Sequence, residues 1–581
     1  MVWTELKQAL ARALEAAGLA TPERLARLDF AVPREPSHGD WTTNFCMLVA
    51  KEAGLPPRKL AEAIVAHFPA DGGIVGGAEI AGPGFLNFRY TDAFLASLPA
   101  RILAEGEAFG NSGFGANEKI LVEYVSANPT GPMNVVSARA SAVGATLVAL
   151  LKAAGWDAAG EFYVNDAGNQ VDLLGESLAA RFAATVGVER PLPPEGYRGE
   201  YLAALAQELP ADEAKAQLAN PLGSRWFRDQ ALERMLAWQQ RDLEAYGVRF
   251  DRWFRESTLH ASGAVDETLQ ALGARGMTYR ATRPEGVSEA AKARVQNEEG
   301  ASAGTAEATW VRTFGFGDDM DRVVVRADGR PTYLLPDVAY HRDKRARGFR
   351  RAINLWGPDH HAYVATLTAA LEALGLEPDF LQVLIVQQVN LLRDGQEVKM
   401  SKRAGEFVTL RELVDEVGPD CARFFFLMRS TSAHLDFDLA LAKKQNDENP
   451  AFYVQYAHAR IASVRAVARQ NAQGESGAAD APSPLLAPEE VALVRKLATF
   501  PEVVRGAAVM REPHRIPTFL TETAAEFHRF YHACRIVADD PRVAAHRLRL
   551  CAATQQVLRN GLALMGVSAP ERLEREAEAT T

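Results

Sequence analysis

The motif with the clearest chemistry is a short basic run, Lys399-Met-Ser-Lys-Arg403, with Gly405 behind it. Ammonium groups at this spacing, with a small hydroxyl residue between them, can surround a polyphosphate. They would stabilise the charge that develops on a leaving pyrophosphate during nucleotidyl transfer. A solvated basic turn is an equally ordinary explanation for so short a match. The candidate catalytic residues here are Lys399, Ser401 and Lys402.

A second candidate is the loop of residues 126–133, which enters a helix at Asn134. Its Pro-Thr-Gly-Pro turn brings the backbone close to whatever lies above it. The helix that follows offers free N–H groups and a partial positive charge, both of which favour phosphate. For any single loop of this kind, an ordinary connection between a strand and a helix is the commoner explanation.

Both loops need a scaffold to position them. Residues 120–125 form a β-rich run, and apolar residues between Val143 and Leu151 recur at helical spacing after the loop. This alternation of strands and helices predicts a parallel sheet with crossover helices, of the Rossmann type. Further candidate strands are residues 322–326, 352–356 and 382–389.

The rest of the chain predicts additional domains around this α/β core. Residues 1–112 mix helical segments with short strands around a Gly-Pro-Gly turn, which indicates an α+β domain. Residues 118–438 form the Rossmann-type catalytic core, with a helical insertion from about residue 175 to residue 246. Apolar stripes at helical spacing in residues 439–581 predict an all-α helical bundle.

Composition excludes several classes of protein. The chain has 581 residues, of which 48% are hydrophobic and 24% charged, so it is neither disordered nor fibrous. Its net charge of −10 does not favour a nucleic-acid binder, although a local basic surface can still attract phosphates. Four widely separated cysteines argue against a disulfide framework and a structural zinc site, so we nominate no metal ligands. No membrane span or secretory signal is recognisable, and we expect a cytoplasmic protein.

Two segments together, Glu123-Tyr-Val-Ser-Ala-Asn-Pro-Thr-Gly-Pro132 and Lys399-Met-Ser-Lys-Arg403, resemble the ATP-binding signatures of class I aminoacyl-tRNA synthetases. The chain is most similar to the arginyl-tRNA synthetases. The likeness continues in order through His38-Gly-Asp40, Ala81-Gly-Pro-Gly-Phe85, Glu161-Phe-Tyr-Val-Asn-Asp-Ala-Gly168, Tyr453-Val-Gln-Tyr-Ala-His-Ala-Arg460 and Phe527-His-Arg-Phe-Tyr531.

This resemblance implies a reaction and its partners. ATP is a substrate, L-arginine is activated as arginyl-adenylate, and the arginyl group passes to its cognate tRNA; in this family the first step typically needs bound tRNA. The N-terminal domain would contact the outer corner of tRNA, and the helical C-terminal domain would read the anticodon. We also expect Mg²⁺ with the ATP and a monomeric enzyme.

The resemblance also assigns binding residues. It places Glu123 and Asn128 near the α-amino group of arginine, and Tyr333 and Asp337 near its guanidinium. A guanidinium is a permanent planar cation, so a carboxylate can meet it through paired hydrogen bonds while an aromatic ring flanks it. A helix-capping role is the plain alternative for Asp337.

For ATP, the same resemblance nominates residues from three places. One is the segment after a strand, where Asp359 would accept hydrogen bonds from the ribose or merely cap the next helix. The others are the start of the first helix and the basic loop. The full set is Asn134, Ser137, Gly357, Asp359, His360 and Met400.

The chain departs from the family pattern at one place. The first signature normally continues as His, any residue, Gly, His, whereas this chain has Asn134-Val-Val-Ser137. A charged histidine contributes ~1.5–3 kcal/mol through a hydrogen bond, against ~0.5–1.5 kcal/mol for a neutral amide. The side chain of Val136 also occupies space that a glycine leaves free for adenine. A loss of ~2–4 kcal/mol would slow activation about 30- to 1,000-fold unless neighbouring groups compensate.

Three functions are therefore open. The first is ATP-dependent ligation of arginine to tRNA. The second is a catalytically impaired relative that binds tRNA or arginine without ligase activity. The third, a small-molecule nucleotidyltransferase, is disfavoured because it needs no anticodon platform.

Two further clusters have two explanations each. The basic run of residues 341–351 would contact the acceptor stem of tRNA or form a solvated helix face. In the helical tail, aromatic and basic residues would stack on unpaired bases or pack in the core. These are Tyr453, Tyr456, His458, Arg460, Phe530 and Tyr531.

Overall fold

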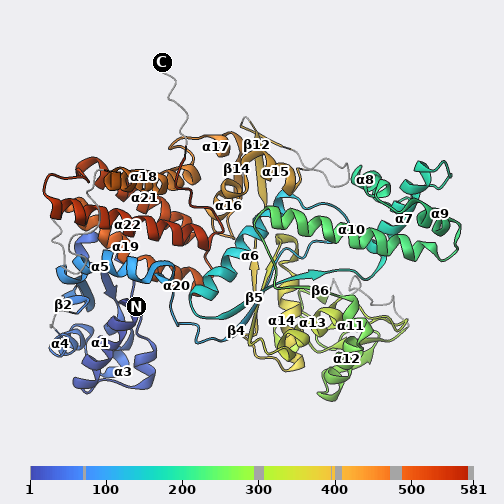
Figure 1. Ribbon diagram of the computed structural model, residues 1–581. Coiled ribbons are helices and arrows are strands. Elements are labelled where there is room, and N and C mark those ends of the chain that lie inside the picture. The colour runs from blue at the N-terminus through green and yellow to red at the C-terminus, as the bar shows by residue number, and fades with distance from the viewer. Residues whose placement is uncertain are drawn as a thin grey trace.

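The computed structural model describes residues 2–33, 35–69, 73–292, 306–393, 395–398, 408–470 and 487–573. It has an α/β core, a small N-terminal α+β part and a helical C-terminal part (Figure 1). The predicted fold class is confirmed. The basic motif at residues 399–403 lies outside the described residues.

The core is a five-stranded sheet in which every neighbouring pair of strands is parallel, in the order β11-β10-β4-β5-β6. Because the strand order reverses between β4 and β10, a crevice is expected where the carboxyl ends of these two strands diverge. The bounds are β4 Lys119–Glu123, β5 Asp157–Val164, β6 Arg252–Arg255, β10 Arg351–Trp356 and β11 Leu381–Ile385.

Apolar clusters bury this sheet on both faces. Ile353 and Leu355 of β10 belong to the cluster that includes helix α6, while their neighbour Ala352 belongs to the cluster formed with α12–α14. This arrangement is typical of parallel sheets, which need helices on each side. The covering helices are α6 Val135–Ala153, α11 Ser257–Ala261, α12 Ala264–Ala274, α13 Leu334–Ala346 and α14 Tyr363–Leu374.

Helix α6 is the first crossover and the longest of these helices. By length and hydropathy it would suffice to cross a membrane, but 67% of its apolar window is buried inside the protein, as expected for a core helix. Gly144 allows its close approach to the sheet, because a Cβ there would lie 2.1 Å from the ring of Tyr124.

Between β5 and β6 the chain forms a helical insertion with an apolar cluster of its own, as predicted. Figure 1 shows it extending away from the sheet. It begins a few residues earlier than the sequence indicated. Its helices are α7 Asn169–Thr185, α8 Tyr201–Gln207, α9 Ala211–Ala219 and α10 Gly223–Ala245.

A second, smaller sheet corrects one prediction. Residues 322–326 do contain a strand, β9, but it pairs antiparallel with β8 in a separate three-stranded sheet and takes no part in the parallel sheet. A strand's own residues cannot specify which neighbour it pairs with. The bounds are β7 Thr278–Ala281, β8 Ala308–Val311, β9 Arg322–Val325, with η4 Phe314–Phe316 between the last two.

The N-terminal part contains an antiparallel sheet in the order β1-β3-β2, and the predicted Gly-Pro-Gly turn joins β2 to β3. Helices cover the sheet. The bounds are α1 Val2–Ala16, α2 Pro22–Ala26, η1 Pro36–His38, β1 Trp41–Thr43, α3 Phe45–Ala53, α4 Pro57–Val65, β2 Val75–Ala81, β3 Phe85–Tyr90, α5 Asp92–Glu105 and η2 Gly106–Ala108.

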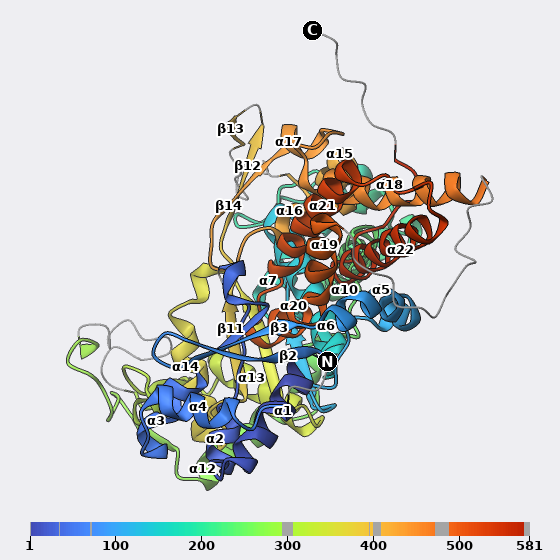
Figure 2. The same cartoon turned by 90° about the vertical axis from the view of Figure 1, so that its left-hand side faces the viewer.

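The C-terminal part is a helical bundle that packs on α5 and α6 (Figure 2). Asn560 ties it to the N-terminal part, since its amide donates to the carbonyls of Gly106 and Phe109, both at 2.9 Å. The bundle helices are α18 Pro450–Gln470, α19 Pro488–Ala498, α20 Phe500–Met510, α21 Arg515–Ala533 and α22 Pro541–Leu564.

Between the sheet and the bundle lies a connecting region. Its elements are β12 Val389–Arg393, β13 Gln396–Glu397, α15 Leu410–Val417, α16 Pro419–Leu427, β14 Leu435–Asp438 and α17 Leu439–Lys443. The short helix η5 Pro358–His360 belongs to the core, between β10 and α14.

Candidate active site

The candidate site begins where β4 ends, at an unusual turn. Val125 and Ser126 have φ angles of 69° and 41°, and two consecutive non-glycine residues in this region, one of them β-branched, indicate a strained backbone. The turn directs Ser126 back toward the sheet. Its hydroxyl donates to Glu123 Oε1 at 3.1 Å and accepts from the backbone N–H of Tyr163 at 3.1 Å. The strain therefore serves to fix the carboxylate of Glu123.

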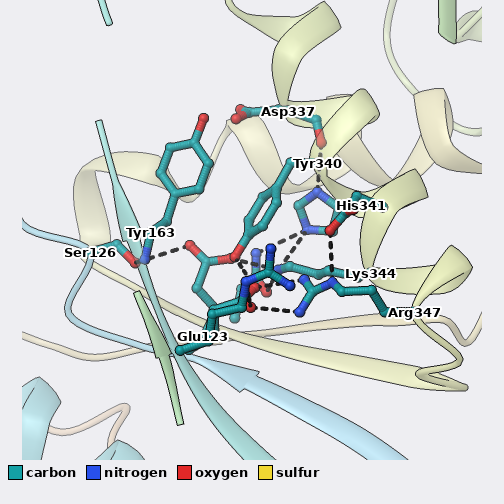
Figure 3. A network of polar contacts seen from close by, with 12 residues as sticks. Glu123, Ser126, Tyr163, Asp337, Tyr340, His341, Lys344 and Arg347 are labelled. Carbon is teal, nitrogen blue, oxygen red and sulfur yellow. Dashed lines mark hydrogen bonds and ion pairs between the residues drawn. The ribbon is translucent and has the colours of Figure 1, made fainter. Parts of the chain in front are cut away.

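The other carboxylate oxygen of Glu123 forms a buried ion pair. Lys344 Nζ lies 2.6 Å from Glu123 Oε2, and the lysine is 0% exposed (Figure 3). The ammonium also donates to Asn354 Oδ1 at 3.0 Å. It lies 4.2 Å from the centre of the Tyr340 ring, which adds a cation–π contact. Buried charges of this kind are stable only when paired and hydrogen-bonded, as they are here.

Glu161 is a second carboxylate close to this pair, and several hydrogen bonds hold it. Glu161 accepts from the hydroxyl of Tyr340 at 2.6 Å and from two nitrogens of Arg347 at 2.7 and 2.9 Å. The bidentate geometry fixes the orientation of both groups. Tyr340, Lys344 and Arg347 follow each other at spacings of four and three residues, so one face of α13 supplies all three.

His341 completes the network as a neutral group. Burial, and then the charge of Lys344, hold the pKa of His341 well below its ordinary value. Asn354 donates to His341 Nε2 at 3.1 Å, so the proton is assigned to Nδ1, which donates to the carbonyl of Asp337 at 2.8 Å. This contact links the ion pair of Lys344 to the turn of α13 that carries Asp337.

Asp337 differs from these carboxylates because, within the described residues, its partner is a hydroxyl group and not a cation. It is half-buried and accepts from the hydroxyl of Tyr363 at 2.9 Å, and no ion pair to it is found among the described residues. Burial first, and then the charges of Glu123 and Glu256, raise the pKa of Asp337 to about 7. Tyr333 starts α13 as its N-cap, so the capping alternative for Asp337 is wrong.

Aromatic rings and a further acid surround Asp337. The ring of Tyr333 lies 4.8 Å from that of Tyr363 and is 51% exposed. On the other side, the hydroxyl of Tyr163 hydrogen-bonds Glu256, whose pKa burial raises. An unpaired carboxylate, flanked by rings and close to two other acids, favours a planar cation such as a guanidinium.

The predicted ATP residues around α6 form a helix cap. The side-chain oxygen of Asn134 accepts from Ser137 N at 3.0 Å and from Ser137 Oγ at 3.2 Å. Asn134 also forms a β-bridge with Thr409, and Leu410 N donates to Met133 O at 2.8 Å. Thr409 and Leu410, which follow the basic motif in the sequence, thus lie at the N-terminus of α6. Lys399, Met400, Ser401 and Lys402 themselves lie outside the described residues.

The remaining nominated residues follow the carboxyl ends of β4 and β10. Gly357 is the N-cap of η5, directly after β10, with Asp359 and His360 exposed on that short helix. Asp359 caps neither η5 nor α14, so its capping alternative is wrong. Asn128 is exposed on the loop after β4, and its amide donates to Gln170 Oε1 at 2.9 Å. Glu123 and Asn128 thus both lie at the carboxyl end of β4, and the charge of Glu123 acts on Asp337.

Comparison with known proteins identifies the family. The family model for the class I (R) tRNA synthetase catalytic domain matches residues 100–424; those for the arginyl tRNA synthetase N terminal domain and the DALR anticodon binding domain match residues 4–90 and 454–573. The arginine–tRNA ligase of Geobacillus thermodenitrificans (strain NG80-2) is 42% identical over 573 residues, which are 98% of each chain. The chain belongs to the arginyl-tRNA synthetase family.

Other members of the family agree. The arginine–tRNA ligase of Bacillus subtilis (strain 168) is 41% identical over 573 residues, again 98% of each chain. The solved arginyl-tRNA synthetase of Thermus thermophilus superposes with a TM-score of 0.75 over 99% of this chain and 100% of the other, at 22% identity. At that identity, the structural likeness shows the fold.

Sequence reasoning missed the residues that organise the candidate site. The basic run of residues 341–351 was expected to contact tRNA or to be solvated, yet His341 and Lys344 are buried and Arg347 binds Glu161. Both explanations are wrong for His341 and Lys344, because neither side chain reaches the surface. The available signal was helical spacing, because Asp337, His341 and Lys344 recur at intervals of four and three on one face of α13.

Only some of the aromatic and basic residues of the helical tail belong to its core. His458 and Phe530 are 0% exposed and belong to the core. Tyr453 lines a hollow of about 580 Å³ between α18, α19 and α21. The guanidinium of Arg460 lies 4.5 Å above the ring of Tyr531. The remaining lining residues are Glu489, Ala525, His528, Arg529, His532 and Ala533.

Proposed function

We propose that this protein ligates L-arginine to its cognate tRNA in two steps, with ATP as the activating substrate. The observation that carries the proposal is the half-buried carboxylate of Asp337, without a cationic partner among the described residues and flanked by Tyr333 and Tyr363. It lies at the carboxyl edge of the sheet, beside the point where the strand order reverses. A guanidinium there would complete the charge balance that Glu123 already obtains from Lys344.

The first step follows from this placement. With its guanidinium on Asp337, arginine would direct its carboxylate toward ATP at the N-terminus of α6. A carboxylate oxygen attacks the α-phosphorus, the bond to the bridging oxygen of the β-phosphate breaks, and pyrophosphate leaves with that electron pair. Lys399 and Lys402 would stabilise the departing charge, and holding both substrates in line supplies much of the rate enhancement.

In the second step, tRNA is the acceptor. A hydroxyl of its terminal adenosine attacks the carbonyl carbon of arginyl-adenylate and releases its proton to solvent, and AMP departs with the electron pair of the broken bond. We propose that residues 1–112 and 439–581 hold the tRNA while its end reaches the crevice. The hollow that Tyr453 lines supports a role for the helical domain in binding unstacked bases.

We propose that Mg²⁺ arrives bound to ATP. Mg²⁺ prefers phosphate oxygens and water, with few protein ligands. The described residues contain no group of three or more His, Cys, Asp or Glu side chains able to hold a metal ion, so the phosphates would supply most of the ligands. Its chemical contribution would be to offset phosphate charge.

Charging of arginine tRNA by the purified protein tests the proposal. Asp337→Asn removes the charge-assisted contact, and we expect kcat/KM for arginine to fall about 10- to 100-fold. Asp328→Asn is a matched control, because Asp328 is an exposed residue paired with Arg330. Equal charging by wild type and Asp337→Asn would contradict the assignment of Asp337.

A second candidate function is supported by the departure at residues 134–137. Asn134 and Ser137 are engaged with each other in the helix cap, and Val136 is 37% exposed on the surface that would face adenine. A relative with an impaired ATP site would bind arginine or tRNA without ligating them. Absence of charging by a wild-type preparation that binds both would favour this candidate.

A further inference from the structure

The loop of residues 126–133 has little hydrogen bonding of its own. Within these eight residues, all of which the structure describes, the one backbone hydrogen bond runs from Thr130 N to Asn128 O at 2.8 Å. The loop also follows the strained turn at Val125. A segment of this kind keeps a single conformation only if surrounding groups impose it.

Groups outside the loop occupy its carbonyl oxygens. Gln239 of α10 donates from Nε2 to Asn128 O at 3.2 Å and to Gly131 O at 2.9 Å. The hydroxyl of Tyr201 in α8 donates to Thr130 O at 2.6 Å. Three loop carbonyls are thus held by two side chains of the helical insertion.

The buried position of Gln239 is energetically unfavourable for one of its polar atoms. The residue is 1% exposed, and its Oε1 has no hydrogen-bond partner in the described part of the chain. Only the amide nitrogen can donate to two carbonyls, so the orientation of the side chain is fixed. Burying an unpaired acceptor is unfavourable, which makes a purely packing role a poor explanation for glutamine at this position.

The helical insertion has a packed apolar core of its own. Its helices enclose a separate apolar cluster that includes Leu174, Leu205, Phe227 and Met235, all at most 2% exposed. A third side chain joins it to the loop, since Gln170 of α7 accepts from Asn128. Helices α7, α8 and α10 therefore each contribute one side chain to the same loop.

We propose that Gln239 and Tyr201 are positioning residues, through which the helical insertion sets the conformation of residues 126–133 and thereby the placement of Asn128 and the α6 N-terminus toward the substrates. This inference rests on the proposed function. Neither side chain need touch arginine or ATP, because each acts on backbone carbonyls of the loop.

The test compares Gln239→Met and Tyr201→Phe with two matched controls. Gln240→Met changes the next residue of α10, which is exposed, and Tyr197→Phe removes a hydroxyl from a half-buried tyrosine of the same insertion. For each variant of the full chain, kcat and KM for arginine and ATP are measured in tRNA charging. Melting temperature and tRNA affinity are measured in parallel.

We expect kcat/KM for arginine and ATP to fall about tenfold in Gln239→Met and about fivefold in Tyr201→Phe, since each loses hydrogen bonds that a neutral group makes. Melting temperature and tRNA affinity should stay close to wild type, and both controls should match wild type. Kinetics within about twofold of wild type would overturn the inference, as would a rate loss that only accompanies a lower melting temperature. Tyr201→Phe, which loses one oxygen atom, keeps the test valid if Gln239→Met folds poorly.

Failure of the proposed function can be told apart from failure of this inference. If wild type itself does not charge tRNA, the proposed function fails, and the readout becomes ATP and arginine affinity by calorimetry. Weaker binding by the two variants than by the two controls would then still support the positioning role. Equal binding by all five proteins would overturn it.

Discussion

Protonation of Asp337 should control arginine binding. Burial, reinforced by the nearby charges of Glu123 and Glu256, raises the pKa of this carboxyl to about 7, whereas Tyr363 and Lys344 act in the opposite direction. The guanidinium of arginine stays charged at every accessible pH. Arginine should therefore bind the ionised form of Asp337, and at pH below 7 binding must first remove a proton.

The size of the effect follows from the pKa. With a pKa of about 7, roughly one-tenth of the free protein carries an ionised Asp337 at pH 6 and roughly nine-tenths at pH 8. The apparent dissociation constant for a ligand that needs the ionised form scales inversely with that fraction. We expect arginine to bind about tenfold more weakly at pH 6 than at pH 8, a difference of ~1.4 kcal/mol.

Calorimetric titration with L-arginine alone, from pH 5.5 to 8.5 in two buffers of different ionisation enthalpy, measures this directly. Near pH 6 the protein should release about one proton per arginine bound, and above pH 8 almost none. Asp337→Asn should bind weakly and without pH dependence. An affinity independent of pH in wild type, or a slope that persists in Asp337→Asn, would refute the reasoning.

The raised pKa of Asp337 also affects the stability of the fold. The ionised carboxylate favours arginine binding but lowers the stability of the free protein. The pKa of Asp337 in the folded state lies above its unfolded value of about 3.9, so the folded state binds more protons between these two values. The contribution of Asp337 to stability therefore improves as pH falls from about 7 to about 4 and worsens as pH rises. Asp337→Asn should consequently raise the melting temperature at pH 8 while it weakens arginine binding. A lower melting temperature would indicate that Asp337 is already neutralised in the free protein.

Three further outcomes are expected. Lys344→Met leaves Glu123 buried and unpaired and should destabilise the fold by ~3–5 kcal/mol, most of which the double variant with Glu123→Gln should recover in melting experiments. Asn134→His removes a helix cap and should cost ~1 kcal/mol of stability while it lowers the KM for ATP, and a raised KM would count against the phosphate role of this position. Gly144→Ala should lower the melting temperature by several degrees, because its Cβ would meet the Tyr124 ring, whereas Gly506→Ala, with open space around it, should not.

Much of the core could be predicted because its signals are local. The run that ends in Glu123, the turn-rich loop and the apolar helix after it are contiguous, so the β4–α6 unit follows from the sequence directly. The assignment of Asp337 came from family resemblance. What the structure adds is its half-buried setting beside Tyr363, without a cationic partner in the described residues.

Other features depend on partners distant in the chain. Whether Lys344 meets solvent or Glu123 is decided by the packing of α13 on the sheet, which brings together residues 221 positions apart. The bridge between Asn134 and Thr409 has the same origin. The positive φ of Val125 could not be predicted either, because a β-branched residue disfavours it and only the surrounding contacts enforce it.

These long-range contacts converge on one short segment. The carboxyl end of β4 is followed by a strained turn, then by a loop whose carbonyls are held by Gln239 and Tyr201, and then by a residue bridged to Thr409. Gln239 and Tyr201 belong to the helical insertion, whereas Thr409 follows the basic motif in the sequence. These two sets of contacts are the external supports of the segment. If the proposed positioning role holds, a change in either support alters the α6 N-terminus, where one N–H group is already occupied by Asn134. A phosphate that bound there would have to displace Asn134 from the Ser137 N–H group, so removal of this cap should strengthen ATP binding unless it disorders the start of α6.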